Sequence, residues 1–371
     1  MTLIVASPAY PRPPIDGDKV RWSALLSELA RLEPLHTVFG FMGSLGEVSD
    51  PSFDRLLASL DLVPTSRLEV SARAAMLALR GRPSAFGRRS TPGWRKAVLA
   101  AAERHPDAPL LLLGTSGGFI PQIKNPTLLD LVDVRSRVRT MGGDRISGLG
   151  ILAAEIALAR RHQLVLSCES DRTWLVDHGV AVDRMGVVPN GVDSRLLQLT
   201  PPSDSSIILF VGSLHYTPNL EGIRWFIRGC WPQIHAGRPG AKLRVVGYGA
   251  EVVPAAAGVE VYADVPDVQP HYGAAALSVV PLLSARGVQN KVLEAMAAGL
   301  PVIGTAPVAA GLFNEHPLVI ADETQAMIDA CLRLLRDPAE ARRLGAAGRA
   351  YVRRHHDWAA SAALLRNLLP G

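Results

Sequence analysis

The sequence predicts an α/β protein with two domains, each built on a parallel β-sheet. Short runs rich in aliphatic and β-branched residues alternate with helical patterns, which is typical of parallel strands joined by helices. The 371 residues, 48% hydrophobic and 20% charged, suffice for two domains with separate cores. The predicted strands are Leu3–Ser7, Val38–Met42, Leu110–Gly114, Leu164–Ser167, Ile207–Gly212, Leu243–Gly247, Leu277–Pro281 and Pro301–Gly304.

A polar, proline-broken segment predicts the domain boundary. Residues 199–206 lack periodicity, so we expect a first domain over 1–198 and a second over 207–350. A final helical stretch from about Ala339 to Leu369, interrupted near Asp357, suggests that residues 351–371 cross back to the first domain. Doubly wound sheets bind ligands beyond the carboxyl ends of their strands, so we expect the active site between the domains.

Composition excludes several classes of protein. No apolar run approaches the roughly 20 residues of a membrane helix, and Thr2–Ser7 lacks the basic lead of a signal peptide. Cys168, Cys230 and Cys331 are scattered, which favours neither a disulfide framework nor a zinc site. We therefore expect a cytoplasmic protein.

The net charge of +5 is unevenly distributed. The region Arg67–Lys96 holds many arginines against one acid, Glu69, so it can attract an anionic acceptor, phospholipid headgroups or nucleic acid. Nucleic acid is the weakest of these candidates because no nucleic-acid-binding motif is visible. A peripheral contact at the inner membrane face stays open, as does the alternative of a solvated helix and loop.

The segment Ala285–Ile303 contains the most informative pattern. Lys291 and Glu294 share one face of a short helix that follows a loop containing Gly287 and ends at Gly299. The amino end of a helix favours an anion, Lys291 adds a compact charge for phosphate, and Glu294 can accept hydrogen bonds from ribose hydroxyls. The alternative is an ordinary surface Lys/Glu pair.

Seven segments together carry a family resemblance. They resemble retaining glycosyltransferases of the GT-B fold, from the family-4 group, and most closely the bacterial exopolysaccharide-associated sugar transferases. Their order and spacing along most of the chain make a chance match improbable. The segments are Pro14–Arg21, Asp130–Ser136, Val188–Asp193, Phe210–Asn219, Val245–Gly249, Ala263–Asp267 and Lys291–Gly299.

The resemblance implies a fold and a set of site residues. It implies two Rossmann-like domains facing each other across a deep cleft, with Lys291, Arg286 and Glu294 as the catalytic residues. Glu294 would bind the ribose, and Val265 would contact the base through its backbone. The residues implied to bind the donor are Gly17, Asp18, Lys19, Gly212, Ser213, His215, Gly247, Val265, Gly287, Val288, Asn290, Lys291 and Glu294.

The sequence departs from the family pattern at four places. Arg286 stands where many members carry a second glutamate, and Leu214–Asn219 replaces an arginine and a lysine. Arg135 stands where relatives tend to have an acid, and Thr115–Gly118 lacks a common histidine. Diphosphate charge would then be balanced mainly by Lys291, and no general base is identified.

The predicted activity is hexosyl transfer from a nucleoside-diphosphate sugar to an acceptor hydroxyl with retention of configuration. The acceptor is a polysaccharide or lipid intermediate, or a natural product. A sugar-nucleotide 2-epimerase and a non-catalytic sugar-nucleotide-binding paralogue are the alternatives. No metal or other cofactor is expected, although Asp16-Gly-Asp18 matches the Asp-x-Asp string that binds Mn²⁺ or Mg²⁺ in a different glycosyltransferase fold.

The remaining polar and aromatic residues are assigned to structure. Asn190 and Asp193 are expected to set a turn, and the spacing of Trp225, Phe226 and Trp231 predicts a buried helix face. The histidines without triad or metal-ligand spacing are expected to be structural, with His215 the exception because it follows a strand end. They are His105, His162, His178, His215 and His271.

Overall fold

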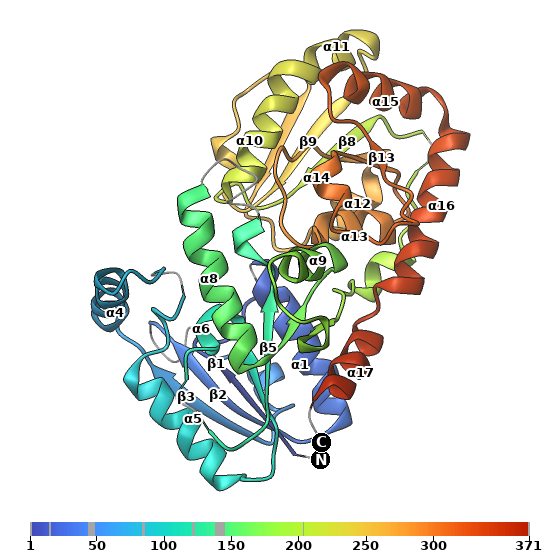
Figure 1. Ribbon diagram of the computed structural model, residues 1–371. Helices are drawn as coiled ribbons and strands as arrows, with labels where there is room; N and C mark the ends of the chain where they lie inside the picture. The colour runs from blue at the N-terminus through green and yellow to red at the C-terminus, as the bar shows by residue number, and fades with distance from the viewer. Residues whose placement is uncertain are drawn as a thin grey trace. The chain divides into compact units, whose positions relative to one another are not determined.

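The protein consists of two compact units, each built on one parallel sheet (Figure 1). A computed structural model describes residues 2–14, 16–43, 49–83, 86–120, 123–137, 145–202 and 204–369. Contacts divide the chain into Met1–Pro189 with Trp358–Gly371, and Asn190–Asp357. The prediction of two parallel-sheet domains is confirmed, whereas the deep cleft stays a prediction. Some residues of predicted segments lie outside the described residues. They are Ile15 of the first quoted motif, Ser84 and Ala85 of the basic region, and Ser203 of the predicted linker.

The first unit contains a seven-stranded parallel sheet in the order β3-β2-β1-β4-β5-β6-β7. Its strands are β1 (Leu3–Ser7), β2 (Leu35–Phe41), β3 (Ser59–Pro64), β4 (Leu110–Leu113), β5 (Thr127–Val132), β6 (Gln163–Leu166) and β7 (Met185–Val187). Its α-helices are α1 (Gly17–Leu32), α3 (Pro51–Asp54), α4 (Arg67–Leu79), α5 (Pro92–Arg104), α6 (Gly114–Gly117), α8 (Arg145–Arg161), α9 (Glu169–Asp177) and α17 (Trp358–Leu368).

Alternate residues of these strands pack against different helices. Leu3 and Val5 of β1 face a core completed by α1 and α17, while Ile4 and Ala6 face one completed by α5 and α8. Successive side chains of a strand point to opposite faces, so apolar strands such as β1 are buried on both sides. This explains why continuous apolar runs predicted β1, β2, β4 and β6, whereas β3, β5 and β7 were not predicted.

A buried ion pair joins α1 to the sheet of the first unit. The Arg21 Nε donates to Asp130 Oδ2 at 2.9 Å, and its Nη1 donates to the Val188 carbonyl oxygen at 2.8 Å. Both side chains of the pair are fully buried. Arg21 is therefore not a solvent-exposed residue at the start of α1, and its partners lie more than 100 residues away, where local periodicity does not reveal them.

The second unit contains a six-stranded parallel sheet in the order β10-β9-β8-β11-β12-β13. Its strands are β8 (Ile207–Val211), β9 (Lys242–Gly247), β10 (Val259–Ala263), β11 (Leu277–Val280), β12 (Val302–Gly304) and β13 (Val319–Ile320). Its α-helices are α10 (Thr217–Trp225), α11 (Trp231–Gly237), α12 (Gln269–Ala274), α13 (Asn290–Ala297), α14 (Ala306–Ala309), α15 (Thr324–Arg336) and α16 (Pro338–His355).

The boundary between the units differs from the predicted linker over 199–206. Asn190 already belongs to the second unit, where its Nδ2 donates to Asn290 Oδ1 at 2.9 Å. The Leu199 carbonyl oxygen accepts from Arg349 Nη2 at 2.6 Å, so these contacts hold the proline-broken segment to the second unit. The predicted interruption of the last helices is confirmed: α16 ends at His355, and α17 begins at Trp358 and packs on α1.

The basic region Arg67–Lys96 is largely helical in its described part. Pro83 and Gly87 lie between α4 and α5, whereas Pro92 and Gly93 occupy the first turn of α5 instead of a loop. Proline fits at this position because the backbone amides of a first helical turn have no intrahelical partner.

The three cysteines are free and buried. No helix among the described residues is long and apolar enough to span a membrane.

The Arg21–Asp130 pair yields a stability prediction. Replacement Arg21→Met leaves Asp130 buried without its counter-ion, which typically costs about 3–5 kcal/mol. Urea unfolding should show this decrease in the free energy of unfolding. The control Arg31→Met removes an exposed pair with Glu28 and should cost at most about 1 kcal/mol. Equal effects of the two substitutions would contradict the importance of the buried pair.

Candidate functional site

The loops that carry the candidate site lie at one edge of the sheet in the second unit. Strands β8, β9, β10 and β11 are neighbours and run parallel, so the segments after them emerge at the same edge. Gly212 and Ser213 follow β8, Val265 follows β10, and the loop to α13 follows β11. The topology therefore gathers residues that are far apart in the sequence.

Two of these loops touch through their backbones. Gly247 has a φ of 145°, and a Cβ atom there would lie 2.3 Å from the Gly212 carbonyl oxygen. Glycine is thus required by both conformation and space. A Cβ atom on Gly212 would in turn lie 3.0 Å from Cε of Lys291, so this glycine lies directly beside the predicted phosphate ligand.

Lys291 is a half-buried cation held by neutral groups. Its Nζ donates to Asn219 Oδ1 at 2.7 Å and lies 3.4 Å from Gln289 Oε1. Burial lowers the pKa of Lys291 to about 8, with Glu294 opposing the shift. No side chain caps the amino end of α13, where Lys291 lies, so backbone N–H groups and an ammonium are available together to an anion.

Glu294 is held by a different residue. The buried Tyr272 donates its hydroxyl proton to Glu294 Oε2 at 2.8 Å. Burial raises the pKa of Glu294, while Tyr272 and Lys291 oppose the shift. Among the described residues no ion pair joins Lys291 to Glu294, and neither is fully exposed. An ordinary surface Lys/Glu pair therefore does not describe this site.

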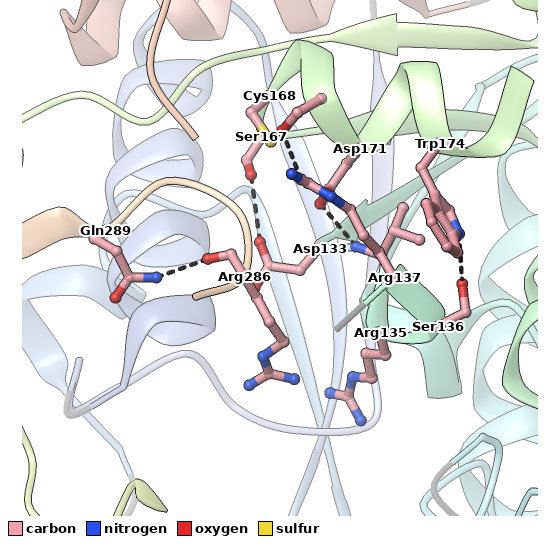
Figure 2. A network of polar contacts seen from close by, with 12 residues as sticks. Asp133, Arg135, Ser136, Arg137, Ser167, Cys168, Asp171, Trp174, Arg286 and Gln289 are labelled. Atoms are coloured by element: carbon pink, nitrogen blue, oxygen red, sulfur yellow. Dashed lines mark hydrogen bonds and ion pairs between the residues drawn. The ribbon is translucent and has the colours of Figure 1, made fainter. Parts of the chain in front are cut away.

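The loop before α13 holds three other predicted residues. The Arg286 Nε donates to the Tyr216 hydroxyl at 3.2 Å, and its guanidinium lies 5.4 Å from the centre of the same ring. The Gln289 Nε2 donates to the Arg286 carbonyl oxygen at 2.7 Å (Figure 2). Gly287 and Val288 are buried in this loop. Their roles in donor binding and catalysis stay predictions.

The end of β10 is tied to the end of β9. Asp264 has a φ of 51°, and its Oδ1 accepts from the Gly249 amide at 3.0 Å. The next residue, Val265, is half-buried, and its contact with a base stays a prediction. His215 packs edge-on against Tyr248, with 4.9 Å between ring centres. That contact gives His215 a packing role at this edge of the sheet. Its role in donor binding stays a prediction.

Gly17, Asp18 and Lys19 form the first turn of α1 in the first unit. Asp16 is the amino-terminal cap of this helix, accepting the Lys19 amide hydrogen at 2.9 Å. This gives Asp16 a structural role. In the described part of the chain, no three His, Cys, Asp or Glu residues gather where they could hold a metal ion. The role of Gly17, Asp18 and Lys19 in donor binding stays a prediction.

A polar network in the first unit holds the segment that follows β5 (Figure 2). The Glu155 carboxylate accepts from the amides of Arg135 and Ser136, at 2.8 and 3.3 Å, and from the Ser136 hydroxyl at 2.5 Å. Asp171 accepts from the Val134 amide at 2.9 Å. Burial raises the pKa of Glu155 to about 7. The network fixes the backbone at Arg135, one of the four places where the sequence departs from the family pattern that it resembles.

The aromatic and imidazole side chains have mostly structural positions. Phe226 and Trp231 are buried, as predicted, and the Trp231 Nε1 donates to the Ala257 carbonyl oxygen at 2.7 Å. His162 is also buried, with its Nε2 at 3.0 Å from the Gly118 carbonyl oxygen. Asn190 was predicted to set a turn, yet its side chain bonds to Asn290, a partner 100 residues away.

Sequence reasoning missed two residues of the site. Asn219 was within a quoted motif but had no assigned role, although its Nδ2 donates to the Ser213 carbonyl oxygen at 2.8 Å while its Oδ1 binds Lys291. An amide at the start of a helix after a glycine-bearing strand end was the available signal. Tyr272 lies on the short helix α12, and nothing in the local pattern indicates its bond to Glu294.

Comparisons with known proteins agree with this geometry. Residues 205–337 match the sequence family described as glycosyl transferases group 1. No curated protein matches the sequence. Sucrose-phosphate synthase from Thermosynechococcus elongatus is structurally similar, with a TM-score of 0.73 and 18% identity over 99% of this chain and 98% of that one.

Two further solved structures have the same fold. Anabaena HepE in complex with UDP-glucose has a TM-score of 0.70 and 14% identity over 99% of both chains. WaaG, a glycosyltransferase involved in lipopolysaccharide biosynthesis, has a TM-score of 0.69 and 15% identity over 100% of both chains. The chain therefore has the GT-B fold, with two Rossmann-like domains, and the family match lies within the unit that holds Lys291 and Glu294.

The lowered pKa of Lys291 yields a pH prediction. If Lys291 binds a diphosphate as predicted, its ammonium form is the binding form, so affinity for a nucleoside-diphosphate sugar such as UDP-glucose should be constant below about pH 7 and fall as the pH rises through about 8. The decline should approach tenfold per pH unit because one proton is taken up on binding. Calorimetric titrations between pH 6 and 9.5 measure it.

The matched variant for this prediction is Lys291→Arg. A guanidinium stays protonated throughout this range, so any affinity that the variant retains should not change with pH. A pH-independent affinity in the wild-type protein would contradict the assignment of Lys291 to the diphosphate.

Proposed function

We propose that this protein is a retaining, family-4 type glycosyltransferase that moves a hexosyl group from a nucleoside-diphosphate sugar to an acceptor hydroxyl. The observation that carries the proposal is a pair of side chains held at one sheet edge. Lys291 is held by its hydrogen bond to Asn219, and Glu294 is held by the hydrogen bond from Tyr272. They lie within the segment matching group 1 glycosyl transferases. Structures of the similar HepE with UDP and UDP-glucose support a uridine donor as the first candidate.

The proposed chemistry places developing charge next to Lys291. Departure of the diphosphate leaves negative charge on its oxygens, and preorganised donors aimed at that charge lower the barrier, each typically by about 3 kcal/mol. Lys291 and the uncapped amides of α13 are such donors. Glu294 would fix the ribose, which holds the reacting carbon in place. The acceptor hydroxyl then attacks the reacting carbon from the leaving-group face and passes its proton to an oxygen of the departing diphosphate, so no protein nucleophile is required.

The proposal is tested first by donor binding. A ligand at 100 times its Kd stabilises a protein by about 2.7 kcal/mol, so saturating UDP should raise the melting temperature of the wild-type protein. Glu294→Ala should abolish this rise while the unliganded variant stays folded. The control Glu251→Ala changes an exposed carboxylate of the same unit and should keep the rise. An undiminished rise in Glu294→Ala would contradict the assigned site.

Turnover separates the remaining alternatives with the same protein. Transfer requires an acceptor and should release UDP at a rate unchanged by a chelator, with the product retaining the anomeric configuration. Rapid epimer formation from UDP-sugar alone would identify an epimerase instead. Strong inhibition by the chelator would assign a metal to the reaction.

We also propose peripheral contact with an anionic membrane through α4. Leu68 and Leu79 on this helix are 83% and 89% exposed, and Arg67 and Arg80 adjoin them. Exposed leucines beside arginines suit the surface of anionic lipid. The wild-type protein should co-sediment with phosphatidylglycerol vesicles at low salt and not with phosphatidylcholine vesicles.

A double substitution tests the role of α4 in membrane contact. Leu68→Ser with Leu79→Ser should remove most of this binding, whereas Leu364→Ser, at an exposed position of α17, should not. Binding unaffected by the double substitution would refute the membrane contact.

A further inference from the structure

The first unit contains a cavity that the proposed donor site does not use. It has a volume of about 210 Å³ and is lined by residues at the carboxyl ends of β1 and β2, including Pro8 and Phe41. These two strands are neighbours in the sheet (Figure 1). The carboxyl edge of a doubly wound sheet is the usual place for a ligand. The volume is below the roughly 300–1,000 Å³ of sites that enclose drug-sized ligands, so the cavity suits one small group.

Three cations line this cavity, and no acid does among the residues described. They are Arg12, Lys19 and Arg89, which come from three separate segments of the chain. Arg12 forms an ion pair with Asp50, which does not line the cavity, with 3.8 Å between Nε and Oδ2. Burial lowers the pKa of Lys19, and the neighbouring Arg89 lowers it further, while Asp16 opposes the shift. This excess of positive charge would be relieved by a bound anion.

Two buried polar atoms at the cavity have no hydrogen-bond partner in the described structure. They are the Nε of Arg12 and the Oγ1 of Thr65. Thr65 is only 8% exposed, so water does not readily satisfy its hydroxyl. A buried polar group without a partner typically costs about 1–3 kcal/mol, and a bound ion is one of the arrangements that satisfies such a group. Both atoms are donors, as an anion requires.

A wider hollow adjoins the cavity. Its volume is about 760 Å³, and Met42 and Thr65 line both spaces. It lies over the amino end of α4, where Ser66 and Glu69 form a capping box. The cavity therefore opens into room for the remainder of a larger molecule. An anionic group attached to a bulkier body fits this arrangement better than a free ion alone.

We propose that this cavity binds a phosphoryl or carboxylate group carried by the acceptor, through Arg12, Lys19, Arg89 and the hydroxyl of Thr65. The inference rests on the proposed glycosyl transfer and names the class of its acceptor as anionic. It assigns Lys19 to the acceptor and replaces the role toward the donor that the sequence predicted. The apolar wall at Phe41 would then contact the uncharged part next to the anion.

Calorimetric titration at constant ionic strength tests this proposal with three probes. Glucose 6-phosphate and inorganic phosphate should bind, and glucose should not. Tighter binding of glucose 6-phosphate than of phosphate would support an anion attached to a larger body. Failure of both anions to bind more tightly than glucose would overturn the proposal.

Matched variants locate the binding in the cavity. Arg89→Met should weaken phosphate binding at least about tenfold, as expected for losing a hydrogen bond between charged groups, and Thr65→Val should weaken it several-fold. The control Arg88→Met removes the neighbouring exposed arginine, which does not line the cavity, and should change affinity less than twofold. Equal losses in Arg88→Met and Arg89→Met would overturn the assignment.

Donor binding by the same variants separates this inference from the proposed function. UDP-glucose affinity should be unchanged in Arg89→Met, and phosphate affinity unchanged in Glu294→Ala. If UDP-glucose fails to bind the wild-type protein while phosphate binds through Arg89, the proposed function fails and the anion site stands. If Arg89→Met loses UDP-glucose as completely as Glu294→Ala does, the cavity serves the donor and the acceptor assignment is overturned.

Discussion

The candidate site depends on the ammonium of Lys291, which stays charged although it is partly removed from water. Lys291 lies at the uncapped amino end of α13, and Asn219 supplies a neutral oxygen at 2.7 Å. A neutral partner orients the ammonium without cancelling its charge, which an acidic partner would do. Burial lowers the pKa of Lys291 to about 8, and a bound diphosphate would raise it again by providing negative charge next to the ammonium.

The same logic explains the neighbouring carboxylate. Glu294 accepts one hydrogen bond from the buried Tyr272 and has no cation bound to it among the described residues. One of its oxygens is thereby fixed, and we propose that the other accepts a hydrogen bond from a ligand hydroxyl. The first unit shows the opposite arrangement at Arg21 and Asp130, where both charges are fully buried and satisfied by each other. The buried pair stabilises the fold, whereas Lys291 and Glu294 are each held by a neutral partner, the arrangement that our proposal requires of ligand-binding residues.

The sequence predicted the architecture better than the contacts within it. Strands buried on both faces, such as β1 and β8, are continuous apolar runs and were predicted within a residue of their observed ends. The strands β3, β5, β7, β10 and β13 were not predicted. The edge strands β3 and β10 carry polar residues such as Asp61 and Glu260 on half-buried or exposed faces, and the apolar run of β5 is interrupted by the buried Asp130. The helix with Lys291 and Glu294 was predicted because glycines mark both of its ends. The partners of these two residues were not, since Asn219 lies 72 residues from Lys291 in the sequence.

A crystal structure with bound UDP-sugar tests the central claim most directly. The account predicts Lys291 Nζ within about 3 Å of a diphosphate oxygen and a Glu294 oxygen at a similar distance from a ribose hydroxyl, with the Tyr272 bond retained. A nucleotide bound to the second unit while both side chains remain turned toward protein partners alone would contradict it.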